Sequence, residues 1–114
     1  MARYRGLTLR VLGEGNPAMG PGKAELIERI AESGSISAAA RDMGMSYRPA
    51  WQLVDALNAA YKAPVVVTAV GGERGGGARV TPLGRRLAAQ FRAMERKASA
   101  AIAADLKRFC RHLR

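Results

Sequence analysis

The sequence predicts a mostly α-helical fold with a small β-hairpin, and three patterns along its 114 residues indicate this. Apolar side chains recur at helical spacing between residues 21 and 61. A β-branched run and a glycine-rich turn follow over residues 64–81, and a second helical repeat fills residues 82–114. We therefore expect a compact domain over residues 1–81 and a long C-terminal helix over residues 82–114.

Composition limits the possible functions. The chain carries 19 basic and 9 acidic residues, a formal net charge of +10, which points to an anionic partner such as nucleic acid or an acidic membrane surface. No apolar run approaches the roughly 20 residues that span a bilayer, and the N-terminus has no signal-type apolar core. With Cys110 as the single cysteine, we expect a cytoplasmic protein with no internal disulfide and no membrane partner.

The N-terminal third predicts a short strand and a first helix. Residues 7–12 alternate apolar and polar side chains, which is typical of a strand, and a glycine- and proline-rich connector follows. The helix is expected to begin near residues 21–23, because Leu26 and Ile30 lie one turn apart within its apolar face. Gly34 is the signal that ends it.

A second, short helix is expected directly after the first. Ser35 can cap its N-terminus, the alanines at 38–40 let it pack closely, and Gly44 can end it in a left-handed conformation. A third helix begins just beyond this turn, with Ser46 as its cap. Pro49 falls in its first turn, where the missing N–H breaks no intrahelical bond.

The third helix, expected to run to about Tyr61, is amphipathic. Its apolar stripe consists of Ala50, Leu53, Val54 and Leu57. Arg48 and Gln52 lie on the opposite side of the helix. Two helices joined by a tight glycine turn form a helix-turn-helix, in which the second helix offers its N-terminal residues to the DNA major groove. The alternative is an ordinary helical hairpin that packs only for stability.

The segment after the third helix predicts a β-hairpin. PVVVTAV is a β-branched run over residues 64–70, GGERGGG is a turn over residues 71–77, and ARVT is a returning strand over residues 78–81. A hairpin with a basic glycine tip after a helix-turn-helix makes a winged helix, in which glycine lets Arg74 and the backbone approach DNA closely. The alternative is a hairpin loop without contacts.

The last helix is expected to start at Pro82, with Thr81 as its cap, and to run almost to the C-terminus. About thirty residues at 1.5 Å rise make a rod of roughly 45 Å, longer than one small domain can cover. Its apolar stripe therefore needs a partner, and a second copy of the helix gives a two-fold dimer. The residues expected at this interface are Leu87, Phe91, Met94, Ile102, Leu106 and Phe109. The alternative is a helix that folds back or frays in its alanine-rich middle.

These residues carry a family resemblance. SGSISAAARDMGMSYRPAWQLVDALN and VVVTAVGGERGGGARVTPLGRRL closely resemble the DNA-binding domain of the molybdate-responsive ModE regulators, and more distantly the LysR-type helix-turn-helix. The most specific parts are Ser46 and Tyr47 with Trp51, and the wing leading into residues 81–84. The resemblance implies a dimeric winged-helix transcription factor. Because the chain stops at Arg114, without room for molybdate-binding domains, we expect no molybdate site in it.

The function predicted from the sequence is sequence-specific binding of double-stranded DNA by a homodimeric transcriptional regulator. Arg48 and Gln52 are expected to reach base edges, because a bidentate arginine reads guanine and glutamine reads adenine. Ser46 and Tyr47 would hold phosphates at the positive end of the helix dipole. The complete set expected to bind DNA is Ser46, Tyr47, Arg48, Pro49, Gln52, Arg74, Gly75, Gly76 and Arg79.

Other functions remain as alternatives. One is a non-specific architectural DNA-binding protein, and another is a protein-interaction module that uses the long helix. The basic tail helix is equally compatible with a solvated face. We expect no enzyme and no cofactor, because no nucleophile with a neighbouring base is evident. We expect no structural zinc site, because Cys110 and His112 are the only thiol and imidazole.

Overall fold

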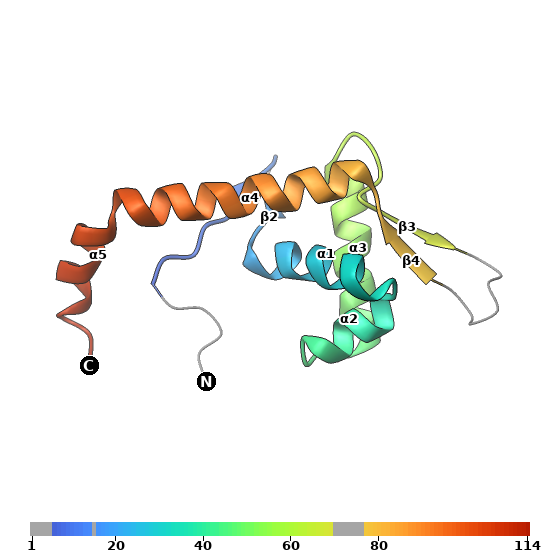
Figure 1. The fold of residues 1–114 in the computed structure, drawn as a ribbon, viewed down its shortest axis with the longest axis horizontal. Coiled ribbons are helices and arrows are strands. Elements are labelled where there is room, and N and C mark those ends of the chain that lie inside the picture. Colours follow the sequence, from blue (N-terminus) through green and yellow to red (C-terminus); the bar gives the residue numbers. More distant parts are fainter. Residues whose placement is uncertain (1–5, 15, 70–76) are drawn as a thin grey trace.

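The structure, a computed structural model, describes residues 6–14, 16–69 and 77–114. Helices dominate the described chain, with two small antiparallel strand pairs (Figure 1). The elements in chain order are β1 (Val11–Leu12), β2 (Pro17–Met19), α1 (Pro21–Ser33), α2 (Ile36–Asp42), α3 (Tyr47–Ala60), β3 (Val66–Ala69), β4 (Gly77–Val80), α4 (Pro82–Ala101) and α5 (Ala103–Cys110).

The N-terminal strand is shorter than predicted, and it has a partner that was not predicted. β1 keeps only the end of the expected strand and pairs antiparallel with β2, with a bulge in the register. β2 lies in the segment expected to be a turn-rich connector. Because β2 has only three residues and pairs with Val11 and Leu12, the described residues 6–10 have no strand partner. The Tyr61 hydroxyl, at the end of α3, ties β2 down by donating to the Ala18 carbonyl at 2.7 Å.

The three central helices form where the sequence predicts them. Gly34 ends α1 with a φ of 70°, and Gly44 has the same φ after α2. Ser35 caps α2 by accepting a hydrogen bond from the Ala38 N–H at 3.1 Å. Their apolar faces meet in one core with the wing and α4. The core residues are Met19, Ala24, Leu26, Ile27, Ile30, Ile36, Ala39, Ala40, Met43, Ala50, Val54, Leu57, Val65, Val66, Val80, Ala88 and Phe91.

The wing predicted after α3 is confirmed in its described part. β3 and β4 pair antiparallel, with Val66 opposite Val80 and Val67 opposite Arg79. Val66 and Val80 are both buried, so the base of the wing belongs to the core. The tip, with Arg74, Gly75 and Gly76, lies outside the described residues.

The prediction of one long C-terminal helix is wrong. α4 ends at Ala101, and α5 leaves its axis at a steep angle (Figure 1). Ile102 stands at the bend with φ −111° and ψ 14°, outside helical values. α5 brings Leu106 against the N-terminal segment, where a Cβ on Gly6 would lie 3.3 Å from Leu106 Cδ2. The bend at Ile102, within the alanine-rich stretch, therefore occurs together with a contact between α5 and the N-terminal segment.

The core also continues past the expected domain boundary at residue 82. Ala88 and Phe91 of α4 are buried, and α4 packs along α1. Phe91 is 1% exposed within its own chain, so it has no surface to offer a second copy. Its assignment to a dimer interface is corrected: the inner half of α4 completes the domain core.

Candidate nucleic-acid interface

The N-terminal end of α3 projects from the domain with a row of exposed side chains. Ser46, Tyr47, Arg48 and Pro49 are all exposed. Ser46 occupies the N-cap position as predicted, but its side chain makes no capping hydrogen bond. The first N–H groups of a helix have no intrahelical partner, and they lie at the positive end of the helix dipole. This end of α3 thus offers N–H groups and a hydroxyl to an anion.

Arg48 and Gln52 share the outer face of α3. Both are exposed, whereas Ala50 and Val54 are fully buried, so the predicted division of the helix into two faces is confirmed. Four residues separate Arg48 from Gln52, which places them one turn apart on the same side. The two side chains can therefore enter one groove together.

The aromatic residues beside this face differ in their packing. Trp51 is half-buried and packs against the core. Tyr47 remains 48% exposed at the helix start. Tyr47 is therefore accessible to a partner, whereas Trp51 packs α3 against the core.

A short turn joins α2 and α3. Ile36, Ala39 and Ala40 of α2 are buried, so α2 is held by the core along one side. The Met45 N–H donates to the Ala40 carbonyl at 2.9 Å, and Gly44 supplies the left-handed residue between them. This turn leaves α3 braced by α2 with its N-terminus free, which is the geometry of a helix-turn-helix.

A hollow of about 140 Å³ lies between α2, α3 and the wing. Its lining consists of Ile36, Ser37, Tyr47, Trp51, Thr68, Gly77 and Ala78. Ser37 and Thr68 are exposed and bring hydroxyl groups to the same place as Tyr47. Reasoning from the sequence missed both residues. Their positions within the predicted elements could have indicated both residues. Ser37 lies in the first turn of α2, and Thr68 lies on β3 opposite Ala78 of β4.

The wing also carries Arg79, which lines a separate hollow together with Gly34 and Val67. Arg79 is exposed on β4, while its neighbour Val80 is buried. The Ala78 N–H donates to the Gly34 carbonyl at 2.9 Å, which fixes β4 to the end of α1. Arg79 therefore projects from a strand whose neighbouring residue is anchored to the core.

Asn58 connects the wing to α3, a role that was not predicted. Its Oδ1 accepts from the N–H groups of Val65 at 2.8 Å and Val66 at 3.1 Å. Its Nδ2 donates to the Val66 carbonyl at 2.9 Å. The side chain is half-buried, so these bonds are partly shielded from water. The sequence signal that could have indicated this role is the position of Asn58. It is a polar residue directly after the buried Leu57, near the end of a helix that a strand follows.

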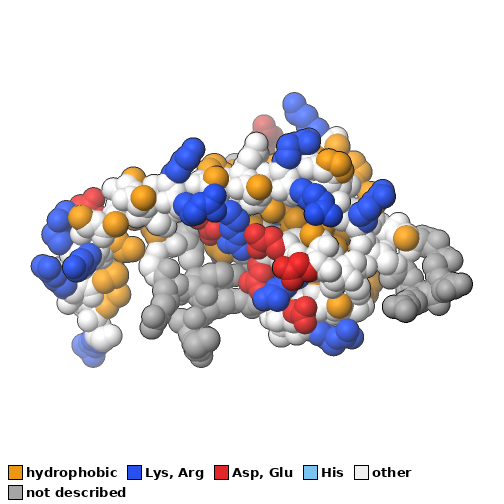
Figure 2. Space-filling model, viewed as in Figure 1, with side chains coloured by type: hydrophobic (Ala, Val, Ile, Leu, Met, Phe, Trp, Pro, Cys, Tyr) orange, Lys and Arg blue, Asp and Glu red, His pale blue; other side chains and the backbone are white. Residues whose placement is uncertain are grey.

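Charge is unevenly distributed over the molecule. Figure 2 shows acidic side chains gathered over α1 and basic ones along α4. Arg92 links the two helices by a two-pronged bond to Glu28, at 2.8 and 3.1 Å, and also contacts Glu95 at 2.8 Å. Hydrogen bonding to Glu28 is the main factor that raises the pKa of Arg92. Part of the acidic surface of α1 is thus neutralised within the fold.

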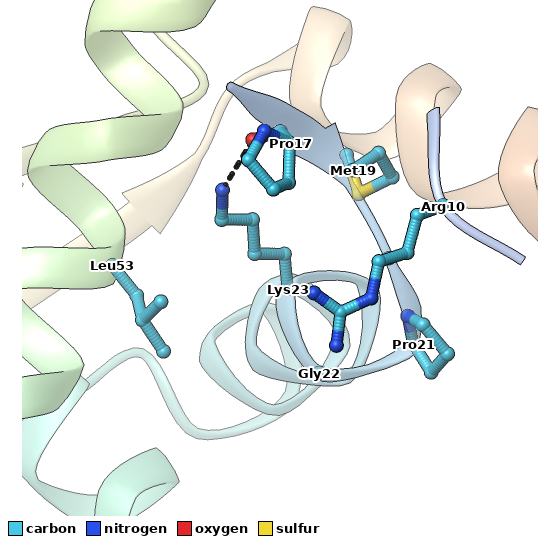
Figure 3. A pocket seen from close by; sticks show the side chains of 8 residues that line it. Arg10, Pro17, Met19, Pro21, Gly22, Lys23 and Leu53 are labelled. Atoms are coloured by element: carbon cyan, nitrogen blue, oxygen red, sulfur yellow. Dashed lines mark hydrogen bonds between the residues drawn. The ribbon is translucent and has the colours of Figure 1, made fainter. Parts of the chain in front are cut away.

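A second hollow, of about 320 Å³, lies where the N-terminal segment meets α1 and α3 (Figure 3). The Lys23 ammonium donates to the Pro17 carbonyl at 2.7 Å across it. Met19 and Leu53 contribute apolar surface, and Arg10 borders the start of α1. The Lys23 hydrogen bond thus joins α1 to β2. We therefore interpret this hollow as a feature of how the N-terminal segment packs on the domain.

The described residues contain no group of three or more His, Cys, Asp or Glu side chains arranged to hold a metal ion. Among the same residues, no helix is long and apolar enough to cross a membrane.

Comparison with known proteins identifies relatives over most of the chain. The protein is 46% identical over 91 residues to the molybdenum-pterin-binding protein MopB of Rhodobacter capsulatus, which covers 80% of this chain and 33% of MopB. It is 43% identical over 67 residues to the DNA-binding transcriptional dual regulator ModE of Escherichia coli K12, covering 59% of this chain and 26% of ModE. The chain thus spans about a third or less of the length of these relatives, and the predicted ModE resemblance is confirmed.

Solved structures show the same fold. The DNA-binding domain in the CbnR–DNA complex matches with a TM-score of 0.57 at 21% identity, covering 80% of this chain and 97% of that one. ArgP from Mycobacterium tuberculosis matches with a TM-score of 0.51 at 29% identity, covering 75% of this chain and 31% of ArgP. The family model for bacterial regulatory helix-turn-helix proteins of the lysR family matches residues 22–85, which is more than half of the sequence. The chain therefore belongs to the lysR family of bacterial regulatory helix-turn-helix proteins.

Proposed function

We propose that this chain binds double-stranded DNA at specific sequences, as a homodimer, and thereby regulates transcription. The observation that carries the proposal is the end of α3: Arg48 and Gln52 are exposed on one face, and α2 braces the helix from behind. The net charge of +10 attracts the chain to a polyanion such as DNA.

Each part of this surface has a separate role in the proposal. Arg48 and Gln52 read base edges in the major groove, since their side chains can make paired hydrogen bonds to guanine and adenine. Ser46 and the first N–H groups of α3 hold one phosphate at the helix terminus. Arg79, with Arg74 at the wing tip, binds the backbone beyond the groove. Ser37 and Thr68 add neutral hydroxyl donors beside Tyr47.

The proposed dimer uses the outer half of α4 together with α5. Met94 and Phe109 are 45% and 66% exposed, so both offer apolar surface that a second copy could cover. Ile102 and Leu106, which lie between Met94 and Phe109 in the sequence, are half-buried. Leu87 packs against the core of its own chain and lies at the inner margin of this surface. A two-fold pair of such chains would place two α3 helices on a palindromic site.

Duplexes selected from a random pool, followed by affinity measurements over a range of salt concentrations, test the proposal. If about six phosphates are contacted, log affinity falls against log salt with a slope near −5. The selected duplex should bind at least about 10³-fold more tightly than a random duplex of equal length. A flat salt response would contradict DNA binding by this basic chain.

Two other outcomes identify the alternatives. Equal affinity for selected and random duplexes, with the same steep salt slope, would indicate a non-specific architectural protein. The exposed Met94, Phe109 and Leu113 favour a third possibility, in which α4 and α5 bind a different protein. Capture of a defined partner protein by the nuclease-treated chain, combined with no measurable duplex binding, would indicate such an interaction module.

A further inference from the structure

We infer that Asn58 is a positioning residue for DNA binding: it holds the wing at the angle at which Arg79 and α3 engage the same duplex. The inference rests on the proposed function and deepens it, because it concerns how two parts of one binding surface are kept in register. Asn58 is the last residue of the first stretch that carries the family resemblance, but the predicted set of DNA-binding residues does not include it.

The hydrogen bonds of Asn58 make a rigid connection. The amide oxygen accepts from two successive N–H groups, of Val65 and Val66, and the amide nitrogen returns a bond to the Val66 carbonyl. Engaging both ends of the amide fixes its orientation, and a partly buried location strengthens each bond. The start of β3 is therefore held at a set distance and angle from the last turn of α3.

The same short segment is held from its other side by the start of α4. The Thr81 N–H donates to the Val65 carbonyl at 2.9 Å, and the Thr81 hydroxyl donates to the Pro64 carbonyl at 2.7 Å. Within the described chain, however, the hydrogen bonds that join α3 to β3 all come from Asn58. Loss of this side chain would leave the wing attached to α4 and α1 but no longer bonded to α3.

Arg79 lies within reach of this connection along the strand pair. Val66, which Asn58 binds, pairs with Val80, and the next residue pair joins Val67 to Arg79. A tilt of β3 at Val66 is thus passed directly to the strand that carries Arg79. Arg48 stands at the far end of α3 and is held there by α2, so the same tilt leaves it in place.

A double-mutant cycle in DNA affinity separates positioning from stability. The full 114-residue chain and the selected duplex are used to measure Kd for Asn58→Ala, Arg79→Ala and the double variant. The matched control cycle replaces Arg79→Ala by Arg48→Ala. We expect Arg79→Ala to weaken binding at least about three-fold less in the Asn58→Ala background than in wild type. The weakening by Arg48→Ala should be the same in both backgrounds, within about two-fold.

Asn58→Asp provides a second variant for the case in which Asn58→Ala does not fold. It keeps the acceptor for the Val65 and Val66 N–H groups and removes the donor to the Val66 carbonyl. Its effect on the Arg79 cycle should lie between wild type and alanine. Thermal unfolding shows which variants are folded at the temperature of the binding assay.

The outcomes for the inference and for the proposed function are distinct. An equal cost of Arg79→Ala in both backgrounds, in chains that are folded and bind the selected duplex, overturns the positioning role. Equal reduction of the Arg48 and Arg79 costs overturns it as well, because that pattern indicates general loosening. A wild-type chain that binds no duplex instead refutes the proposed function.

Discussion

Gly84 of α4 lies against the backbone of Val65 so closely that a Cβ atom at this glycine would stand 2.5 Å from the Val65 carbonyl oxygen. The same atom would be 2.7 Å from a Val80 methyl group. Both neighbours belong to the buried base of the wing. The position thus requires glycine because of close packing, and it fixes how near α4 approaches the wing.

Gly84→Ala is therefore expected to destabilise the fold by about 1–3 kcal/mol, the usual cost of overpacking a core. This direction is opposite to helix propensity, which favours alanine over glycine by about 1 kcal/mol. Urea unfolding measures the change. Ser99→Ala, on an exposed position of the same helix, is the control and should change stability by less than about 0.5 kcal/mol. A more stable Gly84→Ala chain would mean that α4 can move away from Val65.

The link between α1 and α4 through Arg92 predicts a modest stability effect. Arg92→Met should cost about 1 kcal/mol, because the bond to Glu28 is two-pronged but the arginine side chain remains 29% exposed. Arg108→Met is the matched control, since Arg108 pairs with Asp105 on its own helix and both side chains are more than half exposed. Chemical unfolding compares the two. Equal losses for both variants would contradict the role given to the connection between helices.

The half-buried hydroxyl of Tyr61, directly after α3, predicts a pH effect on stability. Burial raises the pKa of the Tyr61 hydroxyl above the ordinary tyrosine value of about 10, so the folded state favours the neutral form. The stability associated with this group is therefore complete below pH 10 and is lost as the pH rises through the higher folded-state pKa. Tyr61→Phe should cost about 1 kcal/mol at pH 8 through loss of the bond to Ala18. Unfolding curves from pH 8 to 11 should show the gap to wild type closing; a constant gap would refute this.

The proposed dimer surface predicts that charge on α4 and α5 gives monomers. Met94→Asp with Phe109→Asp changes two side chains that are exposed in the single chain, so the domain core is untouched. Ser99→Asp with Ala104→Asp adds the same charge at exposed positions elsewhere on these helices. Sedimentation at micromolar concentration should show monomers for the first pair only. DNA affinity should fall in parallel, because each half-site binds weakly alone. A wild type that is already monomeric would refute the dimer.

The parts of the fold that depend on local chemistry could be predicted from the sequence. Gly34, Ser35 and Gly44 mark helix ends by their own conformational preferences, and the structure uses each of them there. The two faces of α3 could be predicted for the same reason, because helical periodicity sorts Arg48 and Gln52 away from the core.

The remaining features depend on contacts between distant segments. The sequence around Ile102 consists of good helix formers, and the direction of α5 involves contact between Leu106 and the N-terminal segment. β2 reads as a turn because it contains Pro17, and only pairing with β1 makes it a strand. Asn58 has its role because the chain reverses direction after α3 and brings Val66 next to the Asn58 side chain. No pattern of neighbouring residues in the sequence predicts this contact.

The most direct test of the central proposal is the affinity of wild type and Arg48→Ala for every single base-pair variant of the selected duplex. Wild type should lose about 1–3 kcal/mol when the base pair read by Arg48 is changed, at symmetric positions in both half-sites. Arg48→Ala should lose its preference at those positions and keep it elsewhere. A uniform loss of affinity with every base preference unchanged would contradict reading by Arg48 and place this arginine on the phosphate backbone.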